Sequence, residues 1–260
     1  MGNGHILETK ELSINFGGIK AVDGLNFHID KGEIIGLIGP NGAGKTTVFN
    51  MLTGVYTPTS GSILWKGENI AGLAPQEIVK RGISRTFQNI RLFGEMRVIE
   101  NVLIGSHTNI DYNLFDSVFE NNRFKTKEDE ATIKAIEILK KLNMEDKIHM
   151  YADSLAYGDQ RKVEIARAVA TGAELILLDE PAAGMNPHES EELLEFISNI
   201  RDIGITILLI EHDMSVVMNV SDRVYVLDSG KLICNGLPEE VAHNPQVIKA
   251  YLGGDAFVNR

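Results

Sequence analysis

The chain has 260 residues, of which 43% are hydrophobic and 23% charged, enough for one large globular domain or for a domain with an inserted subdomain. Its formal net charge of −11 argues against a nucleic-acid partner, because proteins that bind phosphate backbones usually present a basic surface. The single cysteine, Cys234, excludes an internal disulfide framework. No apolar run approaches the 18 residues of a membrane span, and the N-terminus lacks a secretory signal, so we expect a cytoplasmic protein.

The first predicted elements are strands. Short candidates at residues 7–14, 25–29 and 62–65 are separated by Gly and Asp, which predicts an antiparallel flank. Near-continuous apolar runs at residues 34–38, 175–178 and 205–210 indicate strands that are buried on both faces. Such strands belong to parallel sheets covered by helices, so the pattern predicts an α/β fold with a mixed sheet.

Residues 39–47 read GPNGAGKTT and lie between the apolar run 34–38 and a predicted helix at 46–52. Glycines let successive backbone N–H groups point at a phosphate, and the helix adds its positive N-terminal end. A lysine in this position reaches the outer phosphates, and the following hydroxyl can ligate Mg²⁺. We predict a nucleoside-triphosphate site, rather than a merely tight structural turn, made by Asn41, Gly42, Ala43, Gly44, Lys45, Thr46 and Thr47.

Further helices are predicted at residues 75–81, 127–142, 155–170 and 187–201. The last of these has a readable start: Asn186 is the expected N-cap, Pro187 follows at the first helical position, and Glu189 completes a capping-box pattern. Strand signals fade over residues 90–163, which we interpret as an inserted helical subdomain. Residues 1–89 and 164–260 then form the core of the single domain 1–260, and the polar stretch 107–130 is expected to be a surface excursion.

The apolar run from Leu175 ends in two carboxylates, Asp179 and Glu180. A carboxylate at the carboxyl end of a parallel strand lies near the ligand crevice of an α/β sheet. Asp179 is therefore suited to hold Mg²⁺, and Glu180 to orient or deprotonate an attacking water. The alternative interpretation is that the two carboxylates merely solvate a strand end. The phosphate loop elsewhere in the same chain favours the metal and catalytic roles over this alternative.

Three more features could each be purely structural when considered alone. Gln88 lies where the sheet region gives way to the helical segment, and His212 follows the apolar run 205–210 through Glu211. The segment SLAYGDQR at 154–161 opens a helix with small residues, and a helix N-terminus of this kind is an anion site.

Taken together and in this order, the motifs resemble the nucleotide-binding subunits of ABC transporters over nearly the whole chain. The resemblance implies a P-loop NTPase that binds ATP and Mg²⁺. Residues 39–47 are then the Walker A loop, Asp179 and Glu180 close Walker B, and Gln88 is the Q-loop glutamine that touches the metal and senses the membrane subunits. His212 is implied to contact the γ-phosphate. Phe16 is implied to stack on adenine, with Val22 beside it, and residues 183–186 match the D-loop.

The signature segment of this family usually reads LSGGQ, and this chain departs from it. Ala156 lacks the serine hydroxyl, Tyr157 adds bulk, and Asp159 places a negative charge beside a triphosphate, while Gly158 is kept. The charge is unfavourable unless it is solvated or paired, for which Arg161 is the candidate partner. Backbone amides and the helix dipole remain, so we expect weaker phosphate contact rather than loss of function.

Five segments look like one subfamily, the larger of the two ATPases in branched-chain amino-acid importers; they lie at 85–93, 155–158, 179–184, 210–214 and 248–253. The implied partners are two membrane permease subunits, a second ABC ATPase or a copy of the chain in a head-to-tail dimer, and an extracytoplasmic solute-binding protein. The implied place is the cytoplasmic face of the membrane. Urea or short-amide importers remain an alternative, as do a soluble ABC ATPase of translation or DNA repair and a non-hydrolysing nucleotide sensor.

Overall fold

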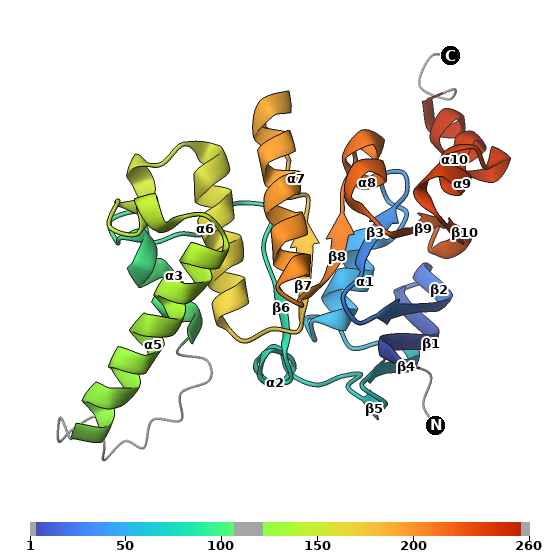
Figure 1. The fold of residues 1–260 in the computed structure, drawn as a ribbon. Coiled ribbons are helices and arrows are strands. Elements are labelled where there is room, and N and C mark those ends of the chain that lie inside the picture. The colour runs from blue at the N-terminus through green and yellow to red at the C-terminus, as the bar shows by residue number, and fades with distance from the viewer. Residues whose placement is uncertain (1–3, 107–121, 256–260) are drawn as a thin grey trace.

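A mixed six-stranded sheet forms the centre of the fold (Figure 1), and the computed structural model describes residues 4–106 and 122–255. The strand order is β10-β9-β3-β8-β7-β6, and every neighbouring pair is parallel except β10 with β9. The three strands predicted from apolar runs are buried along their whole length, which confirms their reading as central strands. The strands are β3 (Ile34–Ile38), β6 (Ile83–Arg85), β7 (Leu175–Asp179), β8 (Thr206–Ile210), β9 (Arg223–Asp228) and β10 (Lys231–Gly236).

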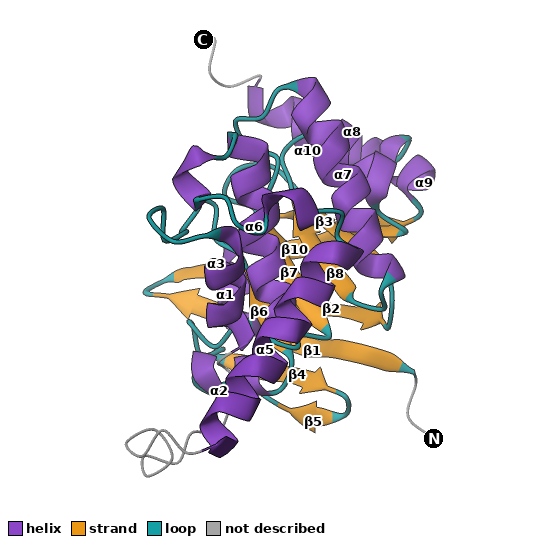
Figure 2. Cartoon of the chain, turned by 60° about the vertical axis from the view of Figure 1, so that its left-hand side comes forward, coloured by secondary structure: helices purple, strands orange, loops and turns teal. Residues whose placement is uncertain are grey.

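Side chains of the central strands alternate between two apolar cores. Ile176 and Leu178 enter one core, and Leu175 and Leu177 enter the other. The first core is closed by helices, which lie in front of the strands in Figure 2, and the second by α1 and an antiparallel sheet. Buried residues of the first core come from α3 (Val98–Ser106), α5 (Asn122–Lys141), α6 (Tyr157–Ala170), α7 (Pro187–Asp202) and the end of α8 (Met214–Val220). Those of the second core come from α1 (Lys45–Leu52) and α2 (Pro75–Lys80).

The antiparallel sheet has the order β2-β1-β4-β5 and contains the three predicted flanking strands. All three are longer than predicted, since residues beyond the apolar stretches also pair with the neighbouring strand. The strands are β1 (His5–Phe16), β2 (Ile19–Asp30), β4 (Ser60–Trp65) and β5 (Glu68–Asn69).

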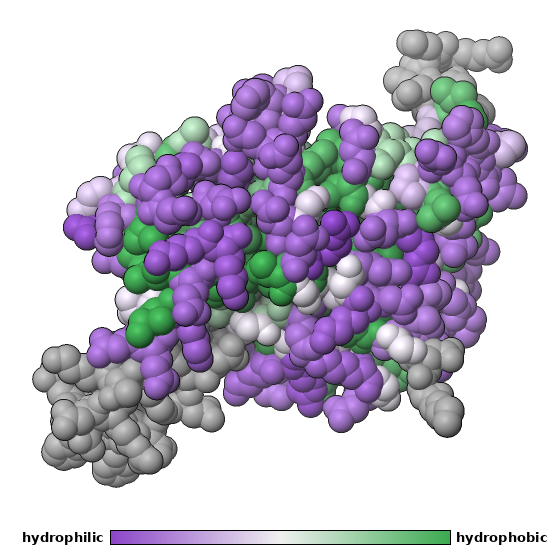
Figure 3. Space-filling model, viewed as in Figure 1, coloured by the Kyte–Doolittle hydropathy of each residue, from purple (hydrophilic) through white to green (hydrophobic). Residues whose placement is uncertain are grey.

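The described residues between β6 and β7 contain helices and two 3₁₀ turns, Glu145–Lys147 and Ala152–Ser154, but no named strand. Helix α6 runs across the predicted boundary at residue 163, so the helical segment and the core share one continuous helix. Part of the predicted surface excursion, residues 107–121, lies outside the described residues. On the face shown in Figure 3 most of the surface is hydrophilic, and hydrophobic residues gather mainly over this helical segment.

Helix α7 begins as its sequence predicts. The Asn186 side chain accepts a hydrogen bond from the Glu189 backbone N–H at 3.0 Å, and the Glu189 carboxylate accepts one from the Asn186 N–H at 3.0 Å. This reciprocal capping box satisfies two of the backbone donors that a helix start leaves unpaired. The described part of the chain has no helix that is both long and apolar enough to cross a membrane.

The C-terminal region adds three helices that the sequence reading did not include: α8 (Met214–Val220), α9 (Pro238–Ala242) and α10 (Pro245–Asp255). They form a third apolar cluster with the outer strands, in which Val217, Val241 and Val247 pack near Ile38 at the end of β3. The C-terminal helices thereby support the strand that leads into the glycine-rich loop.

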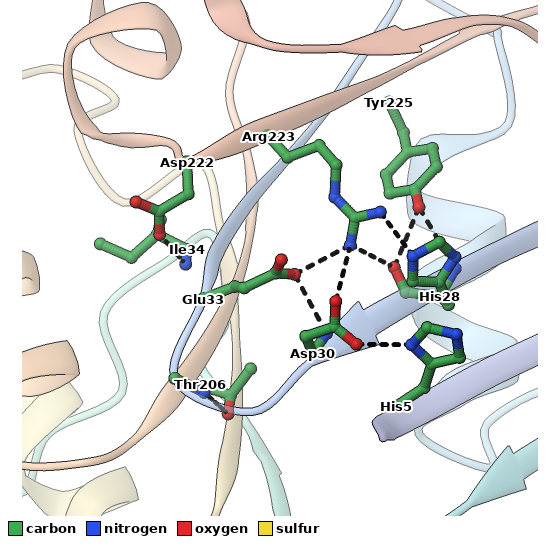
Figure 4. A network of polar contacts seen from close by, with 10 residues as sticks. His5, His28, Asp30, Glu33, Ile34, Thr206, Asp222, Arg223 and Tyr225 are labelled. Carbon is green, nitrogen blue, oxygen red and sulfur yellow. Dashed lines mark hydrogen bonds and ion pairs between the residues drawn. The ribbon is translucent and has the colours of Figure 1, made fainter. Parts of the chain in front are cut away.

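A polar network joins the antiparallel sheet to the central sheet (Figure 4). Arg223 on β9 donates to the His28 ring Nε2 at 2.6 Å and to the Glu33 carboxylate at 2.9 Å, while the Asp30 carboxylate contacts the His5 ring at 2.5 Å. His5, His28 and Asp30 lie close enough together to hold a metal ion. However, the His28 nitrogen already accepts from a guanidinium, so we interpret the cluster as a connection between the sheets.

Candidate nucleotide site

One open cleft gathers most of the predicted site. Its lining contains every residue of the predicted phosphate loop from Asn41 to Thr47, together with Glu180 and His212. The three groups come from the ends of β3, β7 and β8, which are neighbours in the sheet. Ala21 of β2 completes the lining.

Two glycines of the loop are required by close backbone approaches. A Cβ atom at Gly39 would lie 2.1 Å from the Leu227 carbonyl oxygen, and one at Gly44 would lie 2.7 Å from the Ala21 carbonyl oxygen. Gly44 also has φ +104, a conformation that disfavours other residues. The loop is therefore packed closely against β9 and β2.

The Lys45 amine folds back onto its own loop. It donates to the Gly39 carbonyl at 2.6 Å and to the Pro40 carbonyl at 3.1 Å. Burial lowers the pKa of Lys45, and the negative charges of Glu180 and Asp179 oppose that effect. Phosphate oxygens can replace these two carbonyls as acceptors, so the amine is already placed for an anion.

Glu180 lies between two other residues of the predicted site, His212 and Gln88. Its Oε1 contacts the His212 Nε2 at 2.5 Å, and its Oε2 accepts from the Gln88 Nε2 at 2.7 Å. Glu180 has φ +48, a conformation that costs about 1–3 kcal/mol for a residue with a side chain. The backbone hydrogen bond from Glu180 N–H to the Ile210 carbonyl, 2.9 Å, helps to hold this strained position at the mouth of the cleft.

The three residues predicted to hold a metal fit magnesium in their chemistry. Thr46 offers a hydroxyl, Asp179 a carboxylate, and Gln88 its amide oxygen, because its amide nitrogen faces Glu180. Hard oxygen donors of this kind are those that Mg²⁺ prefers. Asp179 is nearly buried and already accepts from the Arg85 guanidinium at 2.6 Å.

Two residues that hold other site residues in place, Arg85 and Glu211, were not predicted from the sequence. Glu211 is buried, and its carboxylate accepts from the Ala182 N–H at 2.7 Å and from the His212 N–H at 3.3 Å. Burial raises the pKa of Glu211. An acidic residue directly after a buried apolar strand was the available signal, since a buried carboxylate must find donors nearby.

The signature residues Ala156, Tyr157, Gly158 and Asp159 lie at the start of α6 and do not line the cleft of their own chain. The Tyr157 hydroxyl donates to the Ala183 carbonyl at 3.3 Å, which links the signature to the predicted D-loop. Asp159 is paired, as its charge requires, with Lys147 at 3.6 Å and Lys162 at 3.7 Å.

The expected pairing of Asp159 with Arg161 is wrong. Residues two apart on a helix face different directions, whereas a residue three positions along shares the same side. Arg161 therefore points into the protein, where it is fully buried and donates to Glu164 at 2.7 Å and to the Phe87 and Gln88 carbonyls at 2.7 and 2.6 Å.

The two predicted adenine contacts differ in position. Phe16 ends β1 with its ring exposed and packs edge-to-face on Tyr56, with ring centroids 5.2 Å apart. Val22 is fully buried beneath Gly44, so its neighbour Ala21 presents surface to the cleft instead.

Comparison with known proteins agrees with this geometry. A family profile described as ABC transporter matches residues 22–183, and one described as branched-chain amino acid ATP-binding cassette transporter matches residues 231–256. The chain is 47% identical to the high-affinity branched-chain amino acid transport ATP-binding protein LivG of Escherichia coli K12, covering 95% of this chain and 98% of that protein. It is 45% identical to BraF of Pseudomonas aeruginosa, with the same coverage.

A solved ATP-binding cassette of an ABC transporter in its ADP conformation superposes with a TM-score of 0.84 at 34% identity, covering 96% of this chain and all of that one. A nucleotide-free cassette from an ABC transporter gives 0.82 at 33% identity, covering 95% of this chain and 98% of that chain. These likenesses confirm the predicted P-loop fold with a mixed sheet, an antiparallel flank and helices. The chain belongs to the ABC transporter family, as an ATP-binding cassette of the LivG type.

Proposed function

We propose that this cassette hydrolyses ATP with Mg²⁺ and thereby drives a membrane importer of branched-chain amino acids. The observation that carries the proposal is the placement of Glu180 between His212 and Gln88 at the mouth of the phosphate loop. The solute rests on likeness to LivG and BraF, whose names state branched-chain amino acid transport.

Nucleotide binding uses the backbone amides of residues 41–47 and the Lys45 amine, which exchanges its two loop carbonyls for phosphate oxygens. Phe16 is exposed at the end of β1 and supplies a ring face for adenine. Ala21 borders the cleft, and Val22 supports Gly44 from below.

Hydrolysis requires a base for the attacking water. In this structure both Glu180 oxygens are engaged by His212 and Gln88. Thr46, Asp179 and the Gln88 amide oxygen would hold the metal. Glu180 Oε2, once the Gln88 amide no longer donates to it, would be free to accept a proton from water. A bound Mg²⁺ would stabilise the charge that develops on the phosphates. His212 then holds Glu180 in place and faces the γ-phosphate.

A dimer completes the site. The signature residues 156–159 lie away from the cleft of their own chain, at an α6 N-terminus where backbone N–H groups are unpaired. We propose that they meet the phosphates of a second cassette, either a copy of this chain or a related ATPase, in a head-to-tail arrangement. Because Lys147 and Lys162 compensate the Asp159 charge, Asp159 does not repel the triphosphate as an isolated carboxylate would.

The permease subunits are proposed to dock beside the Q-loop. Phe87, Phe93, Met150 and Tyr151 are exposed apolar residues there, and a β-bridge between Arg97 and Tyr151 brings their two segments together. Apolar residues gathered on a surface favour a protein partner. The cassette then lies on the cytoplasmic face of the membrane, in a system that also holds an extracytoplasmic solute-binding protein.

The test is uptake of labelled leucine in cells that lack the chain, restored with wild type, Glu180→Gln or the control Glu195→Gln, an exposed carboxylate of α7. We expect rescue by wild type and by Glu195→Gln but not by Glu180→Gln. If leucine uptake never depends on the chain while urea or short-amide uptake does, the solute assignment is wrong and the cassette role stands. Rescue by Glu180→Gln would contradict the catalytic role.

A further inference from the structure

Arg85, the last residue of β6, contacts Asp179, one of the three residues of the proposed metal site. Its guanidinium donates to Asp179 Oδ2 at 2.6 Å and to Asn50 Oδ1 at 2.7 Å, so it joins Walker B to the helix that follows the phosphate loop. It also lies 5.5 Å from the Phe49 ring centroid and 5.9 Å from that of Phe87. Two directed hydrogen bonds and two aromatic rings hold the charge in one place.

Within the described ranges, Arg85 is the one basic side chain at ion-pair distance from Asp179. Lys45 lies near enough to sense the Asp179 charge, but its amine is bound to the Gly39 and Pro40 carbonyls. The exposed fractions of the Arg85 and Asp179 side chains are 12% and 8%, so water screens this pair weakly. Asp179 therefore has its charge balanced before any metal arrives.

We propose that Arg85 acts as an internal counter-ion for Asp179, which keeps the metal site closed to free divalent cations until a nucleotide brings its own negative charge. A cation that arrives without nucleotide meets a carboxylate already neutralised by Arg85, with the further positive charge of Lys45 nearby. Triphosphate oxygens supply the missing negative charge, and the metal then binds together with the nucleotide. The inference rests on the proposed Mg²⁺ site at Asp179.

Arg85 also fixes how Asp179 can ligate. Oδ2 is taken by the guanidinium, so the carboxylate offers Oδ1 to a metal as a single-oxygen ligand. The next residue along, Thr86, pairs through its N–H with the Leu177 carbonyl at 3.0 Å, and Gln88 follows two residues later. Arg85 is thus a positioning residue, which links the carboxylate of Walker B to the start of the Q-loop.

The test measures Mn²⁺ binding by electron paramagnetic resonance, as a probe for Mg²⁺, without nucleotide and with ADP. Without nucleotide, Arg85→Gln should bind Mn²⁺ about tenfold or more tightly than wild type, because a nearby positive charge is removed. Arg85→Lys keeps the charge and should bind as weakly as wild type. Arg81→Gln is the matched control, because the Arg81 side chain pairs with Glu77 alone among the described residues and its loss changes the net charge equally.

A second measurement compares ATP affinity in chelator with ATP affinity in Mg²⁺. The dissociation constant in chelator divided by that in Mg²⁺ should be smaller for Arg85→Gln than for wild type. The reason is that metal binding in this variant depends less on bound nucleotide. If Arg85→Gln does not fold, Asn50→Asp tests the same point, because a carboxylate on the second arm of the guanidinium competes for its charge and should also tighten Mn²⁺ binding.

Equal Mn²⁺ affinity of wild type and Arg85→Gln would overturn the proposal, and so would Lys and Gln variants that behave alike. Absence of Mn²⁺ binding in every protein even with ADP has a different meaning, since it would contradict the metal site itself.

Discussion

The ion pair of Arg161 with Glu164 and that of Arg85 with Asp179 both adjoin the segment that carries Gln88, and they differ in how far their side chains are exposed. The side chains of Arg161 and Glu164 are 0% and 2% exposed, and we call them the sealed pair. Those of Arg85 and Asp179 are 12% and 8% exposed, and we call them the cleft pair. Arg161 also donates to the Phe87 and Gln88 carbonyls, while Arg85 reaches Asn50.

The difference shows that an arginine–carboxylate ion pair can either stabilise the fold or take part in binding a ligand, depending on its exposure. No ligand can reach the sealed pair, so its arginine holds the Q-loop backbone on α6 as a permanent connection. The cleft pair borders the proposed metal site, so a cation can share its carboxylate. Breaking the sealed pair should therefore affect stability most, and changes on the cleft side should mainly affect binding and catalysis.

The largest effect is expected for Arg161→Met. The change leaves Glu164 buried without its main partner and removes donors from two backbone carbonyls, which should lower the free energy of unfolding by about 3–5 kcal/mol. Urea denaturation measures the loss. The double change Arg161→Met with Glu164→Leu should recover part of it, because two apolar side chains leave no buried charge.

Arg167→Met is the control for this prediction. Arg167 contacts the same carboxylate at 3.9 Å and is more exposed than Arg161, so a smaller loss is expected. Equal losses in the two variants would mean that burial of Arg161 and its bonds to the Q-loop add nothing to stability.

On the cleft side, Glu180→Gln should slow ATP hydrolysis by at least about 10²-fold, or roughly 2.7 kcal/mol, because it removes the proposed general base. ATP binding and the free energy of unfolding should change little, since the amide can still meet His212 and Gln88. Phosphate release and fluorescence titration measure the two properties. Turnover close to that of wild type would remove Glu180 from the role of base.

The effect of Arg85→Gln on the free energy of unfolding can be compared directly with that of Arg161→Met. We expect a loss of only about 1–2 kcal/mol in the free energy of unfolding, because Asp179 lies next to the cleft and can gain water when its partner leaves. The same urea series gives the value. A loss as large as that of Arg161→Met would mean that the two pairs do not differ as described.

The smallest effect concerns Glu211, a third buried carboxylate, which accepts only from backbone N–H groups among its described partners. Burial raises its pKa in the folded protein, so ionisation costs stability above that pKa, and the cost vanishes as pH falls below the unfolded value of 4.5. Glu211→Gln keeps an acceptor for Ala182 and should be more stable than wild type by up to about 1 kcal/mol at alkaline pH. Thermal melts across pH should show this advantage disappearing toward acid. An advantage that is independent of pH would contradict the assignment.

Half of the central sheet, strands β3, β7 and β8, was predicted, because these strands are buried on both faces and so consist almost wholly of apolar residues. Strands β5, β6, β9 and β10 and helices α3 and α8 to α10 were not predicted, although β9 contains an apolar run that is buried in the sheet. Helix α7 was predicted with its cap because Asn186, Pro187 and Glu189 act on neighbouring backbone atoms, where spacing along the chain is enough.

The residues of the site also fall into those that a local motif predicts and those that only the fold brings together. The phosphate loop is a local structure, so the sequence motif from Gly39 to Thr47 is enough to predict it without knowledge of its contacts in the fold. The pairing of Asp159 was predicted wrongly because nearness in sequence was taken for nearness on the helix. Arg85 and Asp179 are far apart in the chain and form a pair only because β6 and β7 are adjacent in the sheet.

The sequence by itself determined the fold class, and it predicted the phosphate loop together with the carboxylate, glutamine and histidine of the proposed site. These depend on burial patterns and on short-range backbone geometry, which a linear pattern records. Only the tertiary structure decided which charges meet: Arg161 with the Q-loop carbonyls, Arg85 with Asp179, and Glu180 between His212 and Gln88. Such partners are set by strand order and helix packing, because the free energy of a buried charge depends on whatever the fold brings within a few ångströms of it.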